Sequence, residues 1–501
     1  MTSPSRTAPS LAAKAGRGAA VTFAGQLTRI VVQLLGIVLL ARLLSPSDYG
    51  LTAMVLAIIG VGEILRDFGL SSAAIQARTL TRGQRSNLFW INLGIGAGLT
   101  AIVAGLAVPL ASFYGDDRLV LITLALSVTF LLNGFSTQFR ADLNRNFRFG
   151  WLASAEIGAQ IIALTIALSL AAFGWGYWAL VAQQVLQVLL QAVVLPFVAG
   201  WWPSLPRRGE QMKAFLTFGG GLVGAQLLNY ASRNVASVVI GRQFGAQELG
   251  YFNRAYQLMV LPLNQINAPS SRVALPTLSR LQDQPRRYAD FISFGQTILL
   301  NLVCFVLAFT VAVAPDLVFV ALGPQWGPTV PLFQVLAIAG LFQAAAYSSY
   351  WIYLSQGLTT RYLVYIAITR PFVIAIICLG AVWGVEGVTV AYAVTAALLW
   401  PIGTLFLVGR ATAPLLKLFL TALRTISIYA VAATASWAST LLFPDLFPIA
   451  RMAVGLTGFL LALALIAAVF PPFRRDVLSM ASARRFFRSA RKPAVAQEET
   501  P

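Results

Sequence analysis

Long apolar stretches alternate with short polar segments along the whole chain. We count fourteen such stretches, each about twenty residues long, which is enough to cross about 30 Å of hydrocarbon as a helix. The pattern predicts an all-α integral membrane protein with about fourteen transmembrane helices. The predicted spans lie near 21–40, 51–65, 88–110, 119–137, 152–173, 177–199, 214–240, 254–275, 291–313, 330–353, 362–383, 387–409, 418–440 and 451–470.

The charge of the polar segments alternates in step with the spans. One set sums to +18 and the intervening set to −4, counting Lys and Arg against Asp and Glu. Basic segments stay on the cytoplasmic side of a membrane, so the pattern also predicts orientation, with both termini in the cytoplasm. The basic set comprises the tail before 21, 66–87, 138–150, 200–213, 276–290, 354–361, 410–417 and the tail after 470.

Composition agrees with a membrane protein and excludes several other classes. The 501 residues are 58% apolar and 11% charged, with a mean hydropathy of +0.76. The net charge of +19 lies mainly in the short basic loops, so we predict no nucleic-acid partner. The chain has no histidine, and its two cysteines, Cys304 and Cys378, fall in predicted spans, so we expect free thiols and no metal site. No phosphate-binding loop for ATP is present.

A weak internal repeat joins positions two hundred residues apart. The segment 41–50 aligns without gaps with 241–250, sharing an Arg, an acid six residues later and then a Gly. Because these segments follow the first and seventh spans, the repeat predicts two six-helix lobes, an arrangement found in transporters with central binding sites. The predicted domains are a tail (1–20), an N-terminal lobe (21–200), a C-terminal lobe (201–412), an additional helix pair (413–470) and a basic tail (471–501).

Charged side chains inside spans are costly and point to function. Arg29, Arg233 and Arg370 lie deepest in their predicted spans, and the repeat aligns Gln33 with Arg233. A cationic cavity for an anionic ligand is one explanation. Neutralisation of each arginine by a buried carboxylate is the other, which we disfavour because the spans hold only two acids, both near their cytoplasmic ends. Secondary candidates near span ends are Glu63, Glu156, Arg254 and Arg272.

Two further features each have a structural and a functional interpretation. Gln183, Gln187 and Gln191 form one helical stripe, which either hydrogen-bonds neighbouring helices or presents a polar wall to sugar hydroxyls. The arginine-rich tail after Pro471 is explained as a stop-transfer block, or as an amphipathic segment on anionic lipid. Prolines 262, 269 and 371 predict kinked spans.

Several segments resemble one family of membrane proteins. Segment 41–50 (ARLLSPSDYG), Ile64–Leu70 followed by Ala74–Gln76, Phe113–Asp116 and Tyr251–Ala255 are similar to the Wzx/WzxC-like oligosaccharide flippases. That group is the polysaccharide transporter family of the multidrug/oligosaccharidyl-lipid/polysaccharide export superfamily. The similarity covers about residues 18–410.

The resemblance implies two six-helix lobes around a central cavity, in the bacterial inner membrane. It implies a transporter, not an enzyme, that moves an undecaprenyl-diphosphate-linked oligosaccharide to the periplasmic leaflet for exopolysaccharide, O-antigen or capsule synthesis. It implies no cofactor, an unidentified coupling ion (H⁺ or Na⁺), and a polysaccharide polymerase and export machinery as partners. The alternatives are a drug or peptidoglycan-precursor exporter of the same superfamily and, more distantly, a membrane-embedded polymerase or ligase.

Overall fold

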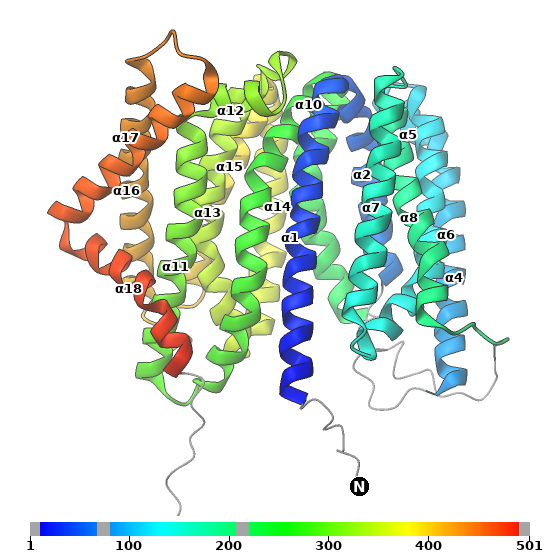
Figure 1. Ribbon diagram of the computed structural model, residues 1–501, viewed down its shortest axis with the longest axis horizontal. Coiled ribbons are helices and arrows are strands. Elements are labelled where there is room, and N and C mark those ends of the chain that lie inside the picture. The colour runs from blue at the N-terminus through cyan, green and yellow to red at the C-terminus, as the bar shows by residue number, and fades with distance from the viewer. Residues whose placement is uncertain (1–10, 68–80, 207–219, 490–501) are drawn as a thin grey trace, which may run out of the picture. The chain divides into compact units, whose positions relative to one another are not determined.

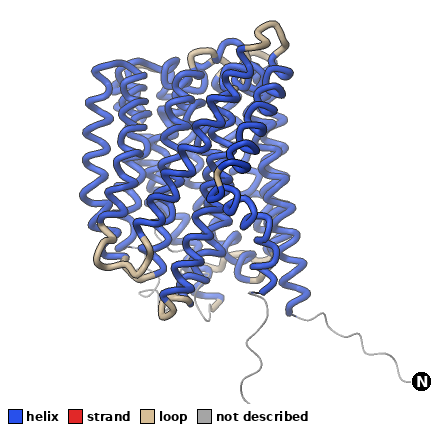
Figure 2. Tube along the Cα trace, turned by 90° about the vertical axis from the view of Figure 1, so that its left-hand side faces the viewer, coloured by secondary structure: helices blue, strands red, loops and turns tan. Residues whose placement is uncertain are grey.

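The computed structural model describes residues 11–67, 81–206 and 220–489, and within these ranges it is helical throughout, with short loops (Figure 2). Helices are what the apolar composition demands, because inside a bilayer every backbone amide must be satisfied within its own segment. Eleven stretches in the described ranges are long and apolar enough to cross a membrane, and one of them, Thr359–Leu405, contains two helices. The all-α membrane fold is confirmed, while the count of fourteen spans and the side of the termini stay predictions.

The chain divides into two compact units, Met1–Asn253 and Arg254–Pro501. Unit 1 contains α1 (Leu11–Leu43), α2 (Pro46–Asp67), α4 (Arg82–Gly105), α5 (Ala107–Tyr114), α6 (Arg118–Arg145), α7 (Phe149–Ala172) and α8 (Tyr177–Ala199). The boundary between the units falls within α10 (Gly220–Arg280). The predicted lobe boundaries at 200 and 412 therefore remain predictions.

Unit 2 holds the remaining helices (Figure 1). They are α11 (Pro285–Ala312), α12 (Ala314–Ala321), η1 (Pro324–Trp326), α13 (Thr329–Ser355), α14 (Thr359–Gly380), η2 (Ala381–Trp383), α15 (Gly384–Leu405), α16 (Leu415–Leu441), α17 (Pro448–Val469) and α18 (Pro471–Ser489). Helix α16 packs on α11 and α17, and α13 packs on α15. Buried hydrogen bonds join helices of this unit. Tyr288 Oη of α11 bonds to Ser355 Oγ of α13 (2.7 Å), and Tyr353 Oη of α13 donates to the Gly403 carbonyl of α15 (2.9 Å).

Glycines allow pairs of helices in unit 1 to approach each other closely. A Cβ on Gly25 would lie 3.3 Å from Ala153, and one on Gly36 would lie 3.2 Å from Leu164, so α1 and α7 run parallel and close together. A Cβ on Gly96 would lie 2.5 Å from the carbonyl oxygen of Phe130, and α4 and α6 run antiparallel. Both relative directions agree with the alternation that the loop charges predict.

The turn that the repeat singled out begins α2. Ser45 and Asp48 cap this helix reciprocally: the Ser45 amide donates to Asp48 Oδ2 (2.9 Å), and the Asp48 amide donates to Ser45 Oγ (3.3 Å). The segment 241–253, predicted to be an external loop, is mostly helical, but two helices meet at a break within it. The break is Gly245, with φ 85° and ψ −176°, and Gly245 is the repeat partner of Ser45.

The prolines do not interrupt their helices. Helix α10 continues through Pro262, Pro269 and Pro276, and Gly245 alone has non-helical backbone angles within it. Helix α14 likewise contains Pro371. Neighbouring helices and local adjustment satisfy the carbonyls that proline leaves free, which is why membrane helices tolerate it.

Candidate functional site: an arginine–glutamate cluster in unit 1

Five charged side chains from four helices of unit 1 form a connected cluster. Its members are Arg29 of α1, Glu63 and Arg66 of α2, Arg140 of α6 and Glu156 of α7. We call these five residues the arginine–glutamate cluster. Arg140 lies within electrostatic range of all four of the others.

Glu156 is shared between two arginines. Its Oε2 accepts from Arg29 NH2, and its Oε1 lies 3.3 Å from Arg140 Nε. Arg140 NH2 also donates to Gln191 Oε1 (2.6 Å), which attaches α8 to the cluster. The sequence argument that no carboxylate neutralises Arg29 is therefore wrong: the helix pair α1–α7 places Arg29 and Glu156 side by side. Gln191, the last member of the predicted glutamine stripe, serves an interhelical hydrogen bond.

Glu63 closes the other half of the cluster. Arg66, one turn along α2, donates to the single oxygen Glu63 Oε2 from both Nε (2.9 Å) and NH2 (2.7 Å). Arg66 NH1 also donates to Thr137 Oγ1 (2.7 Å), and Asn133 Nδ2 donates to Glu63 Oε1 (3.0 Å). These bonds hold α2 against α6.

The cluster carries one positive charge more than its acids neutralise, with three arginines against two glutamates. Its most accessible guanidinium belongs to Arg29, whose side chain is 42% exposed, while the Glu156 side chain is 16% exposed. An arginine held by a carboxylate yet open on one side can exchange that partner for a phosphate, which guanidinium binds with the same bidentate geometry. The cluster therefore offers hydrogen-bond donors and a net positive charge, which are the features that an anionic group requires.

Arg233 lies on α10, beside the helix that carries Glu63. One turn earlier, Tyr230 Oη donates to the carbonyls of Leu56 (3.3 Å) and Ala57 (3.1 Å) of α2. Arg233 itself is exposed, and within the described ranges it makes no hydrogen bond or ion pair. It offers a second cation in unit 1.

The other predicted residues occupy varied environments. Arg370 is half-buried on α14 of unit 2, within electrostatic range of Tyr365. Arg254 is buried and donates to Gln257 Oε1 (2.6 Å), which favours a structural role, and Arg272 is exposed. Gln33, Gln183 and Gln187 are half-buried.

Sequence reasoning missed Arg66 and Arg140, because it placed both in cytoplasmic loops. Helix α2 extends to Asp67 and α6 to Arg145, so these arginines belong to the helices. The spacing Glu63–Arg66, at i and i+3, was the available signal. In the described part of the chain no group of three or more Cys, Asp or Glu residues is arranged to hold a metal ion, and Cys304 and Cys378 are free thiols.

Outside the cluster, Arg85 of α4 pairs with an acid of α6. Arg85 NH1 donates to Asp142 Oδ1 (2.7 Å), and its guanidinium lies 3.9 Å from the ring centroid of Trp201. Trp201 packs on Phe139, and Phe139 on Phe89. These neutralised contacts build the scaffold next to the cluster. The resemblance segment Ala74–Gln76 lies outside the described residues.

Comparison with known proteins agrees with this picture of a membrane transporter. The chain is 26% identical over 359 residues to the teichuronic acid biosynthesis protein TuaB of Bacillus subtilis, covering 70% of this chain and 73% of TuaB. It is 25% identical over 315 residues to the lipopolysaccharide biosynthesis protein WzxC of Escherichia coli, covering 61% and 62%.

Among solved structures, the fold matches the lipid II flippase MurJ with a TM-score of 0.65. That match has 13% identity and covers 91% of this chain and 99% of MurJ. An inward-facing MATE family transporter of the MOP superfamily matches with a TM-score of 0.58 and 14% identity, covering 79% and 94%. These likenesses show that the chain shares the fold of these two transporters. Residues 39–331 match the family described as "Polysaccharide biosynthesis protein", and the chain belongs to that family.

Proposed function

We propose that this protein is a flippase that moves a lipid-linked oligosaccharide across the bacterial inner membrane by alternating access. The cargo is an undecaprenyl-diphosphate-linked glycan destined for exopolysaccharide, O-antigen or capsule. Membership of the polysaccharide biosynthesis family supports this proposal, as do the relatives WzxC and the succinoglycan biosynthesis transport protein ExoT of Rhizobium meliloti. The fold shared with the lipid II flippase MurJ supports it too.

The observation that carries the proposal is the excess positive charge of the arginine–glutamate cluster. A charged group within a membrane bundle is costly and is retained for a task. A diphosphate headgroup brings the negative charge that the cluster lacks. Arg29 is placed to receive it, because its side chain is partly open and its partner Glu156 still has Arg140 when Arg29 leaves.

Arg233 and Arg370 complete the proposed set of substrate-binding arginines. Arg233 is exposed and without an ion-pair partner in the described ranges, so no bond must break before it binds phosphate. Gln33, Gln183 and Gln187 supply amides for glycan hydroxyls, and the lipid tail stays in the bilayer. Translocation needs no covalent chemistry. H⁺ or Na⁺ is the proposed coupling ion, and a polysaccharide polymerase with its export machinery is the proposed downstream partner.

Reconstitution tests the substrate class. Proteoliposomes would be loaded with a fluorescent undecaprenyl-diphosphate oligosaccharide in one leaflet, and its appearance in the other leaflet would be followed by a membrane-impermeant quencher. We expect translocation that protein-free vesicles lack. Movement of lipid II or of a cationic drug, with no movement of the oligosaccharide lipid, would reassign the protein to the alternative transporter classes. Complementation of a polysaccharide-flippase mutant gives the same discrimination in cells.

A further inference from the structure

A cationic groove lies on α16 of unit 2. Its cavity of about 630 Å³ is open and is lined by Pro414, Leu415, Leu416, Lys417, Leu420, Thr421 and Arg424. All seven residues belong to the first three turns of α16 or immediately precede them. We call this feature the α16 groove.

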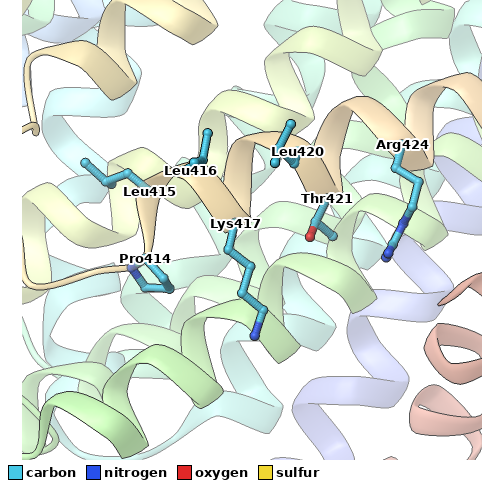
Figure 3. Close-up of a pocket in the computed structure, with 7 residues that line it drawn as sticks. All are labelled: Pro414, Leu415, Leu416, Lys417, Leu420, Thr421 and Arg424. Atoms are coloured by element: carbon cyan, nitrogen blue, oxygen red, sulfur yellow. The ribbon is translucent and has the colours of Figure 1, made fainter.

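The polar residues of the groove share one side of the helix. Lys417, Thr421 and Arg424 are spaced i, i+4 and i+7, which places them in one row. Figure 3 shows their side chains pointing the same way, with Leu416 and Leu420 pointing to the opposite side. The row offers an ammonium, a hydroxyl and a guanidinium, all of which donate hydrogen bonds to phosphate oxygens.

Some hydrogen-bond donors of the groove have no acceptor within the described part of the protein. Lys417 is exposed and makes no hydrogen bond or ion pair in the described part of the chain. Arg424 NH2 pairs with Asp476, but its Nε is buried and has no hydrogen-bond partner. Two cations therefore line the groove, and among the residues that the structure describes one carboxylate, Asp476, is bonded to them.

A second row of α16 is apolar and exposed. Leu416, Leu420 and Leu423 are 72%, 54% and 46% exposed, at a spacing of i, i+4 and i+7. A row of exposed leucines on the helix that also carries these three hydrogen-bond donors fits one kind of ligand, which has an anionic head and hydrocarbon chains. The basic segment 410–417 predicts that this end of α16 is cytoplasmic, where anionic lipids concentrate.

Helix α18 adds charge beside the groove. Asp476 binds Arg424, and Phe473 is buried against Tyr429 with ring centroids 6.1 Å apart, so two contacts fix α18 to α16. Arg474 and Arg475 on the same helix are exposed. Burial raises the pKa of the Asp476 carboxyl, and the Arg424 guanidinium opposes that rise.

We propose that the α16 groove binds an anionic phospholipid of the cytoplasmic leaflet, with its phosphate on Lys417, Thr421 and Arg424 and its acyl chains along Leu416, Leu420 and Leu423. Basic pockets at the cytoplasmic ends of membrane helices bind such headgroups by charge attraction and hydrogen bonding. The bound lipid joins α16 and α18 to the membrane surface, and it is a different ligand from the transported substrate.

Native mass spectrometry of the purified full-length protein tests the proposal, with phosphatidylglycerol and phosphatidylcholine as probes. We expect preferential retention of phosphatidylglycerol. Lys417→Ala should weaken its binding about fivefold, the effect of one surface charge near a phosphate, and Thr421→Val should also weaken it. The matched control is Arg410→Ala, which removes an exposed cation at the same end of α16 but outside the groove, and its binding should stay within about twofold of wild type.

Three results would overturn the proposal. The first is equal retention of both lipids. The second is a Lys417→Ala variant that binds phosphatidylglycerol as wild type does. The third is a Lys417→Ala variant that loses undecaprenyl diphosphate but keeps phosphatidylglycerol, since that would assign the groove to the transported substrate. Because Lys417 is exposed and unpaired in the described ranges, its variants should fold, and an unchanged thermal midpoint would confirm this.

Discussion

Gly50 and Gly250, two hundred residues apart, make the same contact with each other's turn. A Cβ on Gly50 would overlap the carbonyl oxygen of Ala246, and a Cβ on Gly250 would overlap the carbonyl oxygen of Pro46. The four positions form two pairs at an offset of 200, which is the offset of the sequence repeat. The repeat therefore has a structural counterpart in unit 1: two equivalent turns pack against each other, backbone to backbone.

Substituting either glycine should damage the protein although both lie in helices. Alanine normally favours a helix over glycine by about 1 kcal/mol. At Gly50 or Gly250, however, the methyl group meets a rigid carbonyl, so we expect Gly50→Ala and Gly250→Ala each to lower the free energy of unfolding by about 1–3 kcal/mol. Thermal unfolding of the detergent-solubilised protein measures this.

Gly98 is the matched control. A Cβ there would meet no atom within 4 Å, so Gly98→Ala on α4 should be neutral or slightly stabilising. A Gly50→Ala variant as stable as Gly98→Ala would contradict the tight packing of the two turns.

Neutralising Glu156 should affect both stability and transport. Glu156→Gln removes the shared carboxylate of Arg29 and Arg140, and because these side chains are only partly buried we expect a loss of about 1–3 kcal/mol. The freed Arg29 should bind the lipid diphosphate more tightly and release it more slowly. Equilibrium binding and translocation rates in proteoliposomes measure the two effects. Weaker substrate binding in this variant would argue against competition between Glu156 and the diphosphate.

The pair Asp116–Arg118 predicts a small, directional dependence on pH. The Arg118 guanidinium, 2.7 Å away through NH2, holds the pKa of Asp116 below its ordinary value. A carboxyl with a lowered pKa stabilises the fold above its ordinary value near 4, and this contribution is lost as pH falls through the folded-state pKa. Arg118 is exposed and Asp116 is half-buried, so solvent screens the pair and we expect less than about 1 kcal/mol.

Comparison of wild type with Asp116→Asn isolates that contribution. The difference in thermal midpoint between the two proteins should be constant around neutral pH and should disappear in acid. A difference that persists at pH 3 would show that Asp116 acts by something other than its charge.

Removing a buried hydroxyl tests the packing of unit 2. Tyr288→Phe deletes the hydrogen bond between Tyr288 Oη and Ser355 Oγ, and it leaves the Ser355 hydroxyl without that partner. We expect a loss of about 1–2 kcal/mol in unfolding free energy. Tyr288→Phe combined with Ser355→Ala should restore part of it. If the double variant is less stable than the sum of the two single variants, the predicted coupling is wrong.

The helices were predictable because hydropathy is the signal of a bilayer-embedded segment. Each long apolar helix found by the structure overlaps a predicted span, and the short span 51–65 extends back to Pro46, whereas α12, η1 and α18 lie outside the predicted spans. The helical conformation on both sides of Gly245 was not predictable, because polar residues and glycine look like a loop when only this one residue leaves the helical conformation. For a similar reason the sequence pattern assigned Arg66 and Arg140 to loops. They lie on the last turns of helices, where the apolar pattern ends before the helix does.

The candidate site was predictable in part. The cost of burying charge singled out Arg29, Glu63 and Glu156, and the structure joins all three to one cluster. Which arginine pairs with which acid depends on the packing of α1 on α7 and of α2 on α6, and no pattern along the sequence encodes that. Counting the acids in the predicted spans therefore did not reveal that Glu156 forms an ion pair with Arg29.

The most direct test of the proposed function is the Arg29→Ala, Arg233→Ala double variant in the proteoliposome translocation assay. Glu156 keeps Arg140 as its partner in this variant, so it should insert and fold. Arg118→Ala removes an exposed arginine remote in sequence from the cluster and is the control. If the arginines hold the diphosphate, the initial rate should fall at least about tenfold, corresponding to about 1.4 kcal/mol, while the control keeps the wild-type rate. A double variant that translocates the oligosaccharide lipid at the wild-type rate would contradict the proposed function of these arginines.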